Sequence, residues 1–311
     1  MIDTLTIGIR FALYVNLMLL FGLPLFGLYA LRGTERLNGD VLPLRALTIW
    51  LAATGVVLSV LSIFVMTASM AGVALLEVDR ASVSMMISET QMGKAWAVRM
   101  AALFTTLAIA TVMGGRKSPT WLVLVSAGSA TALASLAWTG HGAASEGAAG
   151  MRQLIADIVH LLAAGAWIGA LAALGMLLFR PARSMPKNHI RLTHRALEGF
   201  SLVETVIVAL ILISGVLNSW VLVGPEHLLA MTSTLYGQLL IAKLVLFGGM
   251  VGLAAANRFR LTPAFYQAIE QGGSLEIISH LRRSLILESS AALLILGLVA
   301  WLGTLEPPMS M

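Results

Sequence analysis

The chain has 311 residues, of which 58% are hydrophobic and only 11% are charged, and its mean hydropathy is +0.89. A soluble domain carries about 25% charged residues, so this composition excludes an aqueous protein built around one ordinary core. The 20 Lys and Arg outnumber the 15 Asp and Glu, which gives a formal net charge of +5.

Eight apolar runs follow one another along the chain, and each is long enough to cross a bilayer as a helix of about 20 residues. The runs are continuous rather than alternating, which favours helices over a barrel. They occupy residues 6–31, 45–71, 95–114, 119–139, 151–179, 196–223, 233–256 and 284–304. The sequence therefore predicts an all-α polytopic membrane bundle of about eight transmembrane helices, folded as a single domain over residues 1–311.

The first run has no features of a cleaved leader, because Asp3 precedes it and no basic segment or cleavage site is evident. We expect it to be a retained span. The connection from Ala71 to Lys94, between the second and third runs, has the pattern of an amphipathic helix lying at the membrane surface.

Methionines are numerous, sixteen in all, and cysteine is absent. Met66 and Met70 lie four residues apart at the end of the second run and share a helix face, and Met85, Met86 and Met92 follow. Thioether sulfur is a soft ligand suited to Cu(I), whereas any single methionine is also a common filler of apolar cores. The absence of cysteine excludes disulfides, thiolate metal sites and iron–sulfur clusters. Taken as a group, these methionines indicate copper.

Basic residues are concentrated in alternate loops, which indicates how the bundle sits in the membrane. These residues are Arg32, Arg36, Arg45, Arg116, Lys117, Arg180, Arg183, Lys187, Arg191, Arg195, Arg258, Arg260, Arg282 and Arg283. The positive-inside rule places these loops in the cytoplasm and both termini on the periplasmic side. The positive charge is then a topology signal, no nucleic-acid partner is expected, and His141 and His227 face outward with the methionines.

The fifth run contains Asp157 and His160, one helical turn apart in an otherwise apolar segment. Ionisable groups inside a membrane are costly and mark functional sites. His141 lies just before this run, between two glycines. The carboxylate of Asp157 would either bind an ion directly or orient the imidazole of His160. We therefore predict a metal site from His141, Asp157 and His160, supplemented by the methionines and His227.

Other interpretations stay open for this cluster. His160 would instead bond to a polar group of a neighbouring helix, Asp157 would pair with Lys243 of the seventh run, and His141 would be an ordinary loop histidine. Proton transfer by these groups is a further alternative. Two further carboxylates, Glu204 and Glu288, lie toward the inner side. Together with Lys243 they suggest an inner path or gate, and the alternative for them is pairing with Arg258 or Arg282.

Several segments resemble the copper resistance protein D (CopD/PcoD) family in order and spacing. They are RFALYVNLMLLFGLPLF in the first run, WTGHG from Trp138, HLLAAGAWIGAL from His160, SGVLNSW from Ser214, YGQLLIAKLVLFGGMVGLAAANR from Tyr236, and the last run with Glu288 and LEPP. The resemblance implies eight spans in the bacterial inner membrane, copper as cargo and a periplasmic CopC-like copper-binding protein as donor. In some relatives the donor is fused to the membrane part; here we expect a separate polypeptide.

Copper ion transport across the inner membrane, by uptake from periplasm to cytoplasm, is the function we expect. One alternative is a membrane redox protein that binds haem through His160, and another is a copper-binding partner or sensor that does not transport. We do not expect an enzyme, because no GxSxG, HExxH or P-loop pattern is present.

Overall fold

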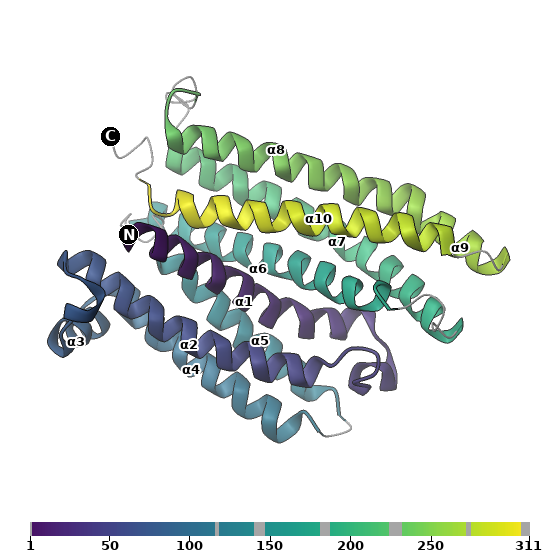
Figure 1. Cartoon of the computed structure of the whole chain (residues 1–311), viewed down its shortest axis with the longest axis horizontal. Coiled ribbons are helices and arrows are strands. Elements are labelled where there is room, and N and C mark those ends of the chain that lie inside the picture. The colour runs from purple at the N-terminus through teal and green to yellow at the C-terminus, as the bar shows by residue number, and fades with distance from the viewer. Residues whose placement is uncertain are drawn as a thin grey trace.

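The computed structural model describes residues 2–115, 118–139, 147–180, 187–223, 232–271 and 275–305. Every regular element in these ranges is helical, and the helices form an elongated bundle (Figure 1). The elements are α1 (Ile2–Ala30), η1 (Gly33–Leu37), α2 (Leu44–Ala71), η2 (Leu75–Glu77), α3 (Arg80–Glu89), α4 (Gln91–Met113), α5 (Thr120–Ala134), η3 (Ser135–Thr139), α6 (Gly147–Leu178), α7 (Lys187–Val223), α8 (Leu235–Ala256), the π-helix η8 (Asn257–Leu261), α9 (Thr262–Gln271) and α10 (Leu275–Leu302). Eight of the described helices are long and apolar enough to cross a membrane, which confirms the predicted fold class.

The helix boundaries agree with the apolar runs except at two starts and at one end, where the helical segment that begins at Leu235 continues through η8 and α9 to Gln271. Helix α7 begins at Lys187 and α10 at Leu275, in each case well before the apolar run. Hydropathy detects only the part of a helix that meets lipid, so polar turns outside the membrane escape it. The Ala71–Lys94 connection is largely helical, as predicted. It contains η2 and α3, and the Asp79 side chain caps α3 by accepting a hydrogen bond from Ser82 N at 2.9 Å.

Helix α1 is the centre of the bundle and packs closely against α6. Its Gly22 lies against Gly165 and Gly169, which are one helical turn apart on α6. A Cβ placed on Gly22 would lie 2.7 Å from Gly169 Cα, too close for any side chain. Small residues at this spacing allow two helix backbones to touch in a membrane. The sequence offered too many small-residue pairs for this contact to be chosen in advance.

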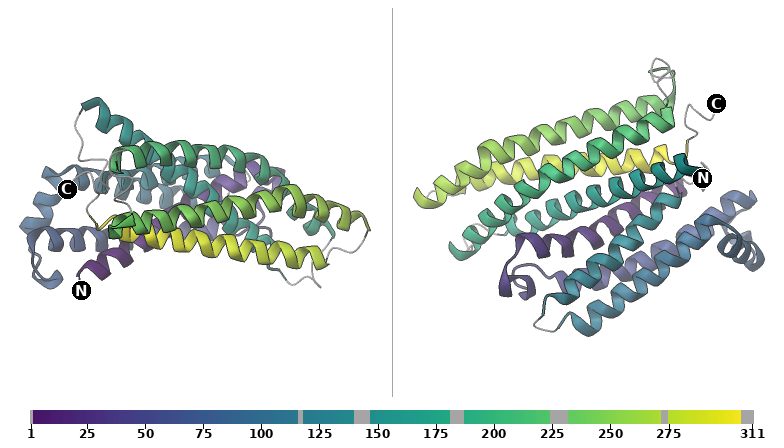
Figure 2. Two further views of the ribbon diagram at one scale, coloured as in Figure 1. Left: turned by 90° about the horizontal axis from the view of Figure 1, so that it is seen from above. Right: turned by 180° about the vertical axis from the view of Figure 1, so that it is seen from behind.

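The other spanning helices lie on two sides of the α1–α6 pair (Figures 1 and 2). Helices α2, α4 and α5 pack together on one side, and α2 and α5 both contact α1. On the other side α7 packs against α6, and α8 packs against α10. The second side is the looser one, and it contains the largest cavity described below.

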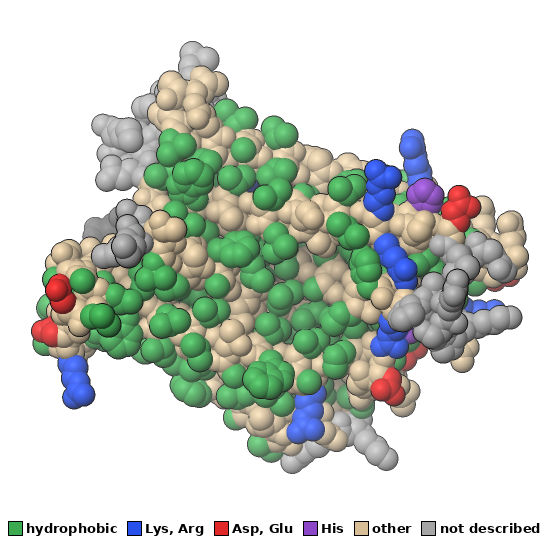
Figure 3. Space-filling view, viewed as in Figure 1, with side chains coloured by type: hydrophobic (Ala, Val, Ile, Leu, Met, Phe, Trp, Pro, Cys, Tyr) green, Lys and Arg blue, Asp and Glu red, His purple; other side chains and the backbone are tan. Residues whose placement is uncertain are grey.

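The two ends of the bundle differ in charge. Helix α1 begins and α10 ends at the same end, which we call the terminal end (Figure 1). On the face shown in Figure 3, hydrophobic side chains cover a broad middle zone, and most visible Lys and Arg lie along the opposite end. We call that opposite end the basic end. The positive-inside rule predicts that it faces the cytoplasm.

Arginines at the basic end donate to backbone carbonyls at the ends of helices. Arg36 donates to Leu31 O and Leu28 O, both at 2.7 Å, and Arg282 donates to Leu178 O at 2.7 Å. Arg45 reaches Thr111 O at 3.0 Å in the same way. The last carbonyls of a helix have no partner within the helix and carry partial negative charge, so a guanidinium there stabilises both.

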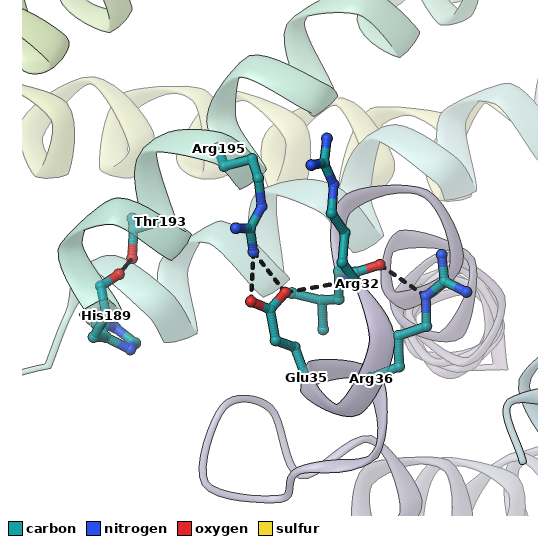
Figure 4. Close-up of polar contacts among 7 residues, drawn as sticks. Arg32, Glu35, Arg36, His189, Thr193 and Arg195 are labelled. Carbon is teal, nitrogen blue, oxygen red and sulfur yellow. Dashed lines mark hydrogen bonds and ion pairs between the residues drawn. The ribbon is translucent and has the colours of Figure 1, made fainter.

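One ion pair, between Arg195 of α7 and Glu35 of η1, ties two segments together at the basic end (Figure 4). Its nitrogen–oxygen distance is 2.6 Å, and the backbone N of Arg32 also donates to Glu35 at 2.9 Å. Partial burial opposes ionisation of Glu35, but the hydrogen bonds from Arg195 and Arg32 outweigh it. They hold the pKa of this carboxyl below its ordinary value.

Candidate metal site

The polar residues of α6 face polar residues of α7. Asn218 donates to Asp157 Oδ1 at 2.6 Å, and His160 Nδ1 lies 3.0 Å from Ser214 Oγ. Asp157 and His160 are one turn apart on α6, and Ser214 and Asn218 are one turn apart on α7, so each pair shares one face of its helix. Two matched polar contacts therefore join the helices within an apolar interface.

The hydroxyl of Ser214 determines which nitrogen of His160 holds the proton. This hydroxyl donates its single proton to Leu210 O at 2.5 Å, so its oxygen accepts from His160 Nδ1–H. In a neutral imidazole the other nitrogen, Nε2, then keeps its lone pair. A neutral imidazole with one nitrogen held and the other free is the form in which histidine binds metals.

Asp157 does not orient His160 in this structure, because Ser214 makes that contact. The carboxylate instead borders a cavity of about 180 Å³ together with His160, Lys243, Tyr236 and Arg10. Asp157 and Lys243 share this cavity, which we call the Asp157 cavity. Among the described residues, however, the only ion pair within 4.0 Å is the one between Arg195 and Glu35. The carboxylate and the ammonium thus face a common space without direct contact.

A larger cavity of about 420 Å³ continues from the Asp157 cavity toward the middle of the bundle. The two share five lining residues, His160, Gly215, Ser219, Leu240 and Lys243. Most of its lining is apolar and comes from α6, α7, α8 and α10, including Trp167 and Phe247. We call it the apolar cavity. His160 stands between a polar space and an apolar one.

Three of the five predicted methionine ligands gather at one place. Met66, Met70 and Met92 line a cavity of about 240 Å³ at the terminal end, which we call the methionine cavity. Met85, on α3, is 62% exposed, whereas Met86 is only 5% exposed, with its sulfur 3.4 Å from Thr90 Oγ1. Neither of these two lines the methionine cavity, and the burial of Met86 shows that it packs within the protein.

The methionine cavity adjoins the Asp157 cavity. Both are lined by Arg10 and Tyr14 of α1 and by Leu136 of η3. The structure thus places the methionines, the Asp157–His160 pair and the apolar cavity in sequence, with side chains shared at each boundary.

Glu204 and Glu288 lie together, nearer the basic end than Asp157. They are 7% and 1% exposed and border a small cavity of about 20 Å³, which has room for one water molecule. Asn257, the first residue of the π-helix η8, donates to Glu288. Arg258 donates to Ser201 O at 3.0 Å rather than to either carboxylate. Lys243 lies about four helical turns before Asn257 and lines the Asp157 cavity instead. Of the predicted inner group, only the two carboxylates therefore lie together.

His141 and His227 lie outside the described residues. Within the described ranges, no three His, Asp or Glu side chains come close enough together to hold a metal ion. The described part of the predicted site is therefore a pair, Asp157 and His160, with three thioethers in the adjoining cavity. Such an open set suits an ion in transit better than one bound permanently.

Comparison with known proteins identifies the family. A model of the copper resistance protein D-like N-terminal domain matches residues 1–151, and a model of copper resistance protein D matches residues 194–302. Copper resistance protein D of Pseudomonas syringae pv. tomato is 47% identical over 307 residues, which cover 99% of this chain and 98% of the relative. The chain belongs to the copper resistance protein D family. The resemblance seen in the sequence is confirmed.

Two further relatives extend this family. Inner membrane protein YebZ of Escherichia coli strain K12 is 27% identical over 305 residues, covering 97% of this chain and 98% of the relative. Copper transport protein CutJ of Bacillus subtilis strain 168 is 33% identical over 182 residues, covering 56% of this chain and 31% of the relative. No solved structure matches the chain. With its eight potential spans, the chain is a multi-span membrane protein of a copper-handling family.

Four polar residues that contact the Asp157–His160 pair or border these cavities were not among the predicted site residues. Ser214 and Asn218 lie in the quoted SGVLNSW segment, where their spacing of four residues on a spanning helix is the signal. Arg10 and Arg99 are single arginines within apolar runs, and such residues are functional candidates by default.

Proposed function

We propose that the protein carries copper across the bacterial inner membrane, from the periplasm to the cytoplasm. Membership of the copper resistance protein D family supports copper as cargo, and the names of two relatives refer to the inner membrane and to copper transport. One observation carries the proposed mechanism. His160 is held at Nδ1 by Ser214, which leaves the lone pair of the neutral imidazole on Nε2, in a cavity that Asp157 also lines and that adjoins the methionines.

In this proposal copper enters at the terminal end, delivered by a separate CopC-like periplasmic protein. Met66, Met70 and Met92 supply soft ligands that select copper from harder ions. The ion then passes to His160 Nε2, where Asp157 offsets part of its charge. Each of these binding sites provides few ligands, so copper is bound weakly enough to be released to the next site.

Glu204 and Glu288 form the inner gate in this scheme. Two carboxylates that share a small buried space attract a cation but repel each other when both are ionised. Arrival of an ion and loss of a proton are therefore linked at this point.

A haem-binding redox role has less support. A haem held by two histidines needs a second axial imidazole, and no other described histidine lines a cavity with His160. A Soret band in the purified protein would overturn the transport proposal in favour of this one.

Copper uptake by proteoliposomes tests the proposal. Vesicles containing the wild type should accumulate Cu(I), measured by mass spectrometry of the washed vesicles. We expect His160→Ala to abolish uptake. Ser214→Ala should reduce copper affinity by about tenfold, as loss of a residue that orients a ligand typically does. Glu288→Gln should slow uptake and flatten its dependence on pH. The matched control is His280→Ala, which removes an exposed histidine of α10 and should leave uptake unchanged.

Two results would contradict transport through this site. Uptake by His160→Ala at the wild-type rate would exclude the proposed ligand. Stoichiometric copper binding without accumulation in wild-type vesicles would instead indicate a copper-binding partner or sensor.

A further inference from the structure

The methionine cavity contains a buried arginine that has no acidic partner among the described residues. Arg99 is only 2% exposed and lies eight residues into α4, about 12 Å along the helix axis. Its Nη2 donates a long hydrogen bond of 3.4 Å to Ser62 Oγ. Its Nε and Nη1 have no partner among the described residues. A guanidinium has five N–H donors, and most of those on Arg99 are unsatisfied.

A second arginine borders the same space from the opposite wall. Among the described residues, Arg10 of α1 makes one hydrogen bond, a long one of 3.5 Å to Thr139 O, and its buried Nε has no partner. The described lining of the cavity contains no Asp or Glu. It does contain further hydroxyl groups, those of Tyr14 and Ser69.

Such an arrangement is costly unless something negative completes it. Arginine stays protonated in proteins, and taking an ion out of water costs several kcal/mol per ion. Packing alone does not explain why two arginines line the methionine cavity, because a Leu or Met side chain would fill the same volume without the cost of burying a charge. At the basic end, by contrast, Arg36 and Arg282 donate to backbone carbonyls, and Arg195 pairs with Glu35.

We propose that the methionine cavity binds a phosphate group between Arg99 and Arg10. The guanidinium fork matches the geometry of a phosphate oxyanion, and charge-assisted hydrogen bonds of this kind are about twice as strong as neutral ones. The volume of about 240 Å³ accommodates such a group, and exposed Met70 and Ser69 leave the cavity accessible from the terminal end. The phosphate comes either from inorganic phosphate in solution or from the headgroup of an anionic phospholipid.

Two binding measurements separate the sources. Full-length protein is placed in nanodiscs of phosphatidylcholine and titrated with inorganic phosphate by calorimetry. In parallel, protein in mixed phosphatidylcholine and phosphatidylglycerol is released from lipid, and retained phosphatidylglycerol is counted by native mass spectrometry. Binding in the first measurement identifies the free anion, and retention in the second identifies the lipid headgroup.

Arg99→Gln should weaken whichever binding is seen by at least tenfold, because it removes the buried charge and part of the fork. Arg99→Lys keeps the charge and should bind at an intermediate level, since an ammonium lacks the bidentate geometry. Arg10→Gln provides a second, independent loss of binding should Arg99→Gln fail to give monodisperse protein. Arg80→Gln is the control, because it removes an exposed arginine of α3 near the same end and should bind as the wild type does.

The proposal is overturned if wild-type protein shows neither phosphate binding nor retained phosphatidylglycerol. It is equally overturned if the Arg99 and Arg10 variants bind as well as Arg80→Gln. Neither result depends on copper, so the outcome is independent of the proposed transport.

Discussion

At the basic end of the bundle, several arginine side chains donate hydrogen bonds to backbone carbonyl oxygens. At the terminal end, by contrast, the side chains of Arg99 and Arg10 border a cavity. Arg36, Arg45 and Arg282 each reach carbonyls at helix ends, with donor–acceptor distances between 2.7 and 3.3 Å. Arg99 has a single hydrogen bond of 3.4 Å. One residue type thus has two uses: where its donors are satisfied it stabilises the fold, and where they are unsatisfied it indicates a ligand.

The strongest test of this difference is removal of an arginine that caps a helix. Arg282→Met should lower the free energy of unfolding by about 2 kcal/mol, because hydrogen bonds to a charged group are lost at the end of α6. Unfolding in mixed micelles with increasing denaturing detergent measures this change. Wild-type stability in this variant would show that the capping contact contributes little.

The same substitution at the terminal end should have the opposite sign. Arg99→Met fills a similar volume without a buried charge, and replacing buried charges by apolar groups is often neutral or stabilising by about 1 kcal/mol or more. The measurement is made in a maltoside detergent without lipid or added phosphate, so that no phosphate group supports the wild type. A loss as large as that of Arg282→Met would mean that Arg99 is a structural residue like those of the basic end.

The smallest effect is expected at the ion pair between Arg195 and Glu35, because both side chains remain partly exposed. Glu35→Gln should cost less than about 1 kcal/mol at pH 7. Since the folded-state pKa of Glu35 is lowered, the contribution of this carboxylate is present above its unfolded-state pKa and is lost as the pH falls through the folded value. Melting curves of the two proteins should therefore converge in acid. A gap that persists unchanged at low pH would exclude the ion pair as its source.

The sequence was sufficient for the eight spans because lipid requires continuous apolar runs, and the structure places a helix at each. The sequence was insufficient to predict the contacts between these helices. Which face of α6 meets α7 depends on side-chain packing, so the hydrogen bond from His160 to Ser214 could not be deduced from hydropathy. The starts of α7 and α10 were placed too late for a related reason, because their first turns are polar and lie outside the apolar runs.

The candidate site was predictable in part. Asp157 and His160 were found because polar residues are conspicuous in an apolar helix, and the structure places both beside one cavity. The methionines were grouped by sequence position alone, and this grouped Met86 with residues that it does not join in space. Arg99 was overlooked because the basic residues were counted by loop, which passes over an arginine within a span.

The glycine contact between α1 and α6 has a mechanical consequence. Where Gly22 lies against Gly165 and Gly169, the two helix backbones are in direct contact. This close packing prevents the two helices from moving closer together or sliding past each other. Across the apolar cavity, by contrast, α7 and α8 face each other with about 420 Å³ between them. Any movement that admits or releases an ion therefore falls to α7 and α8, while α1 and α6 act as a fixed frame. Because the chain has no cysteine, paired cysteines can test this directly, as a disulfide across the α1–α6 contact and as a bifunctional thiol crosslink across the apolar cavity. Crosslinking α7 to α8 should arrest uptake, and crosslinking α1 to α6 should not.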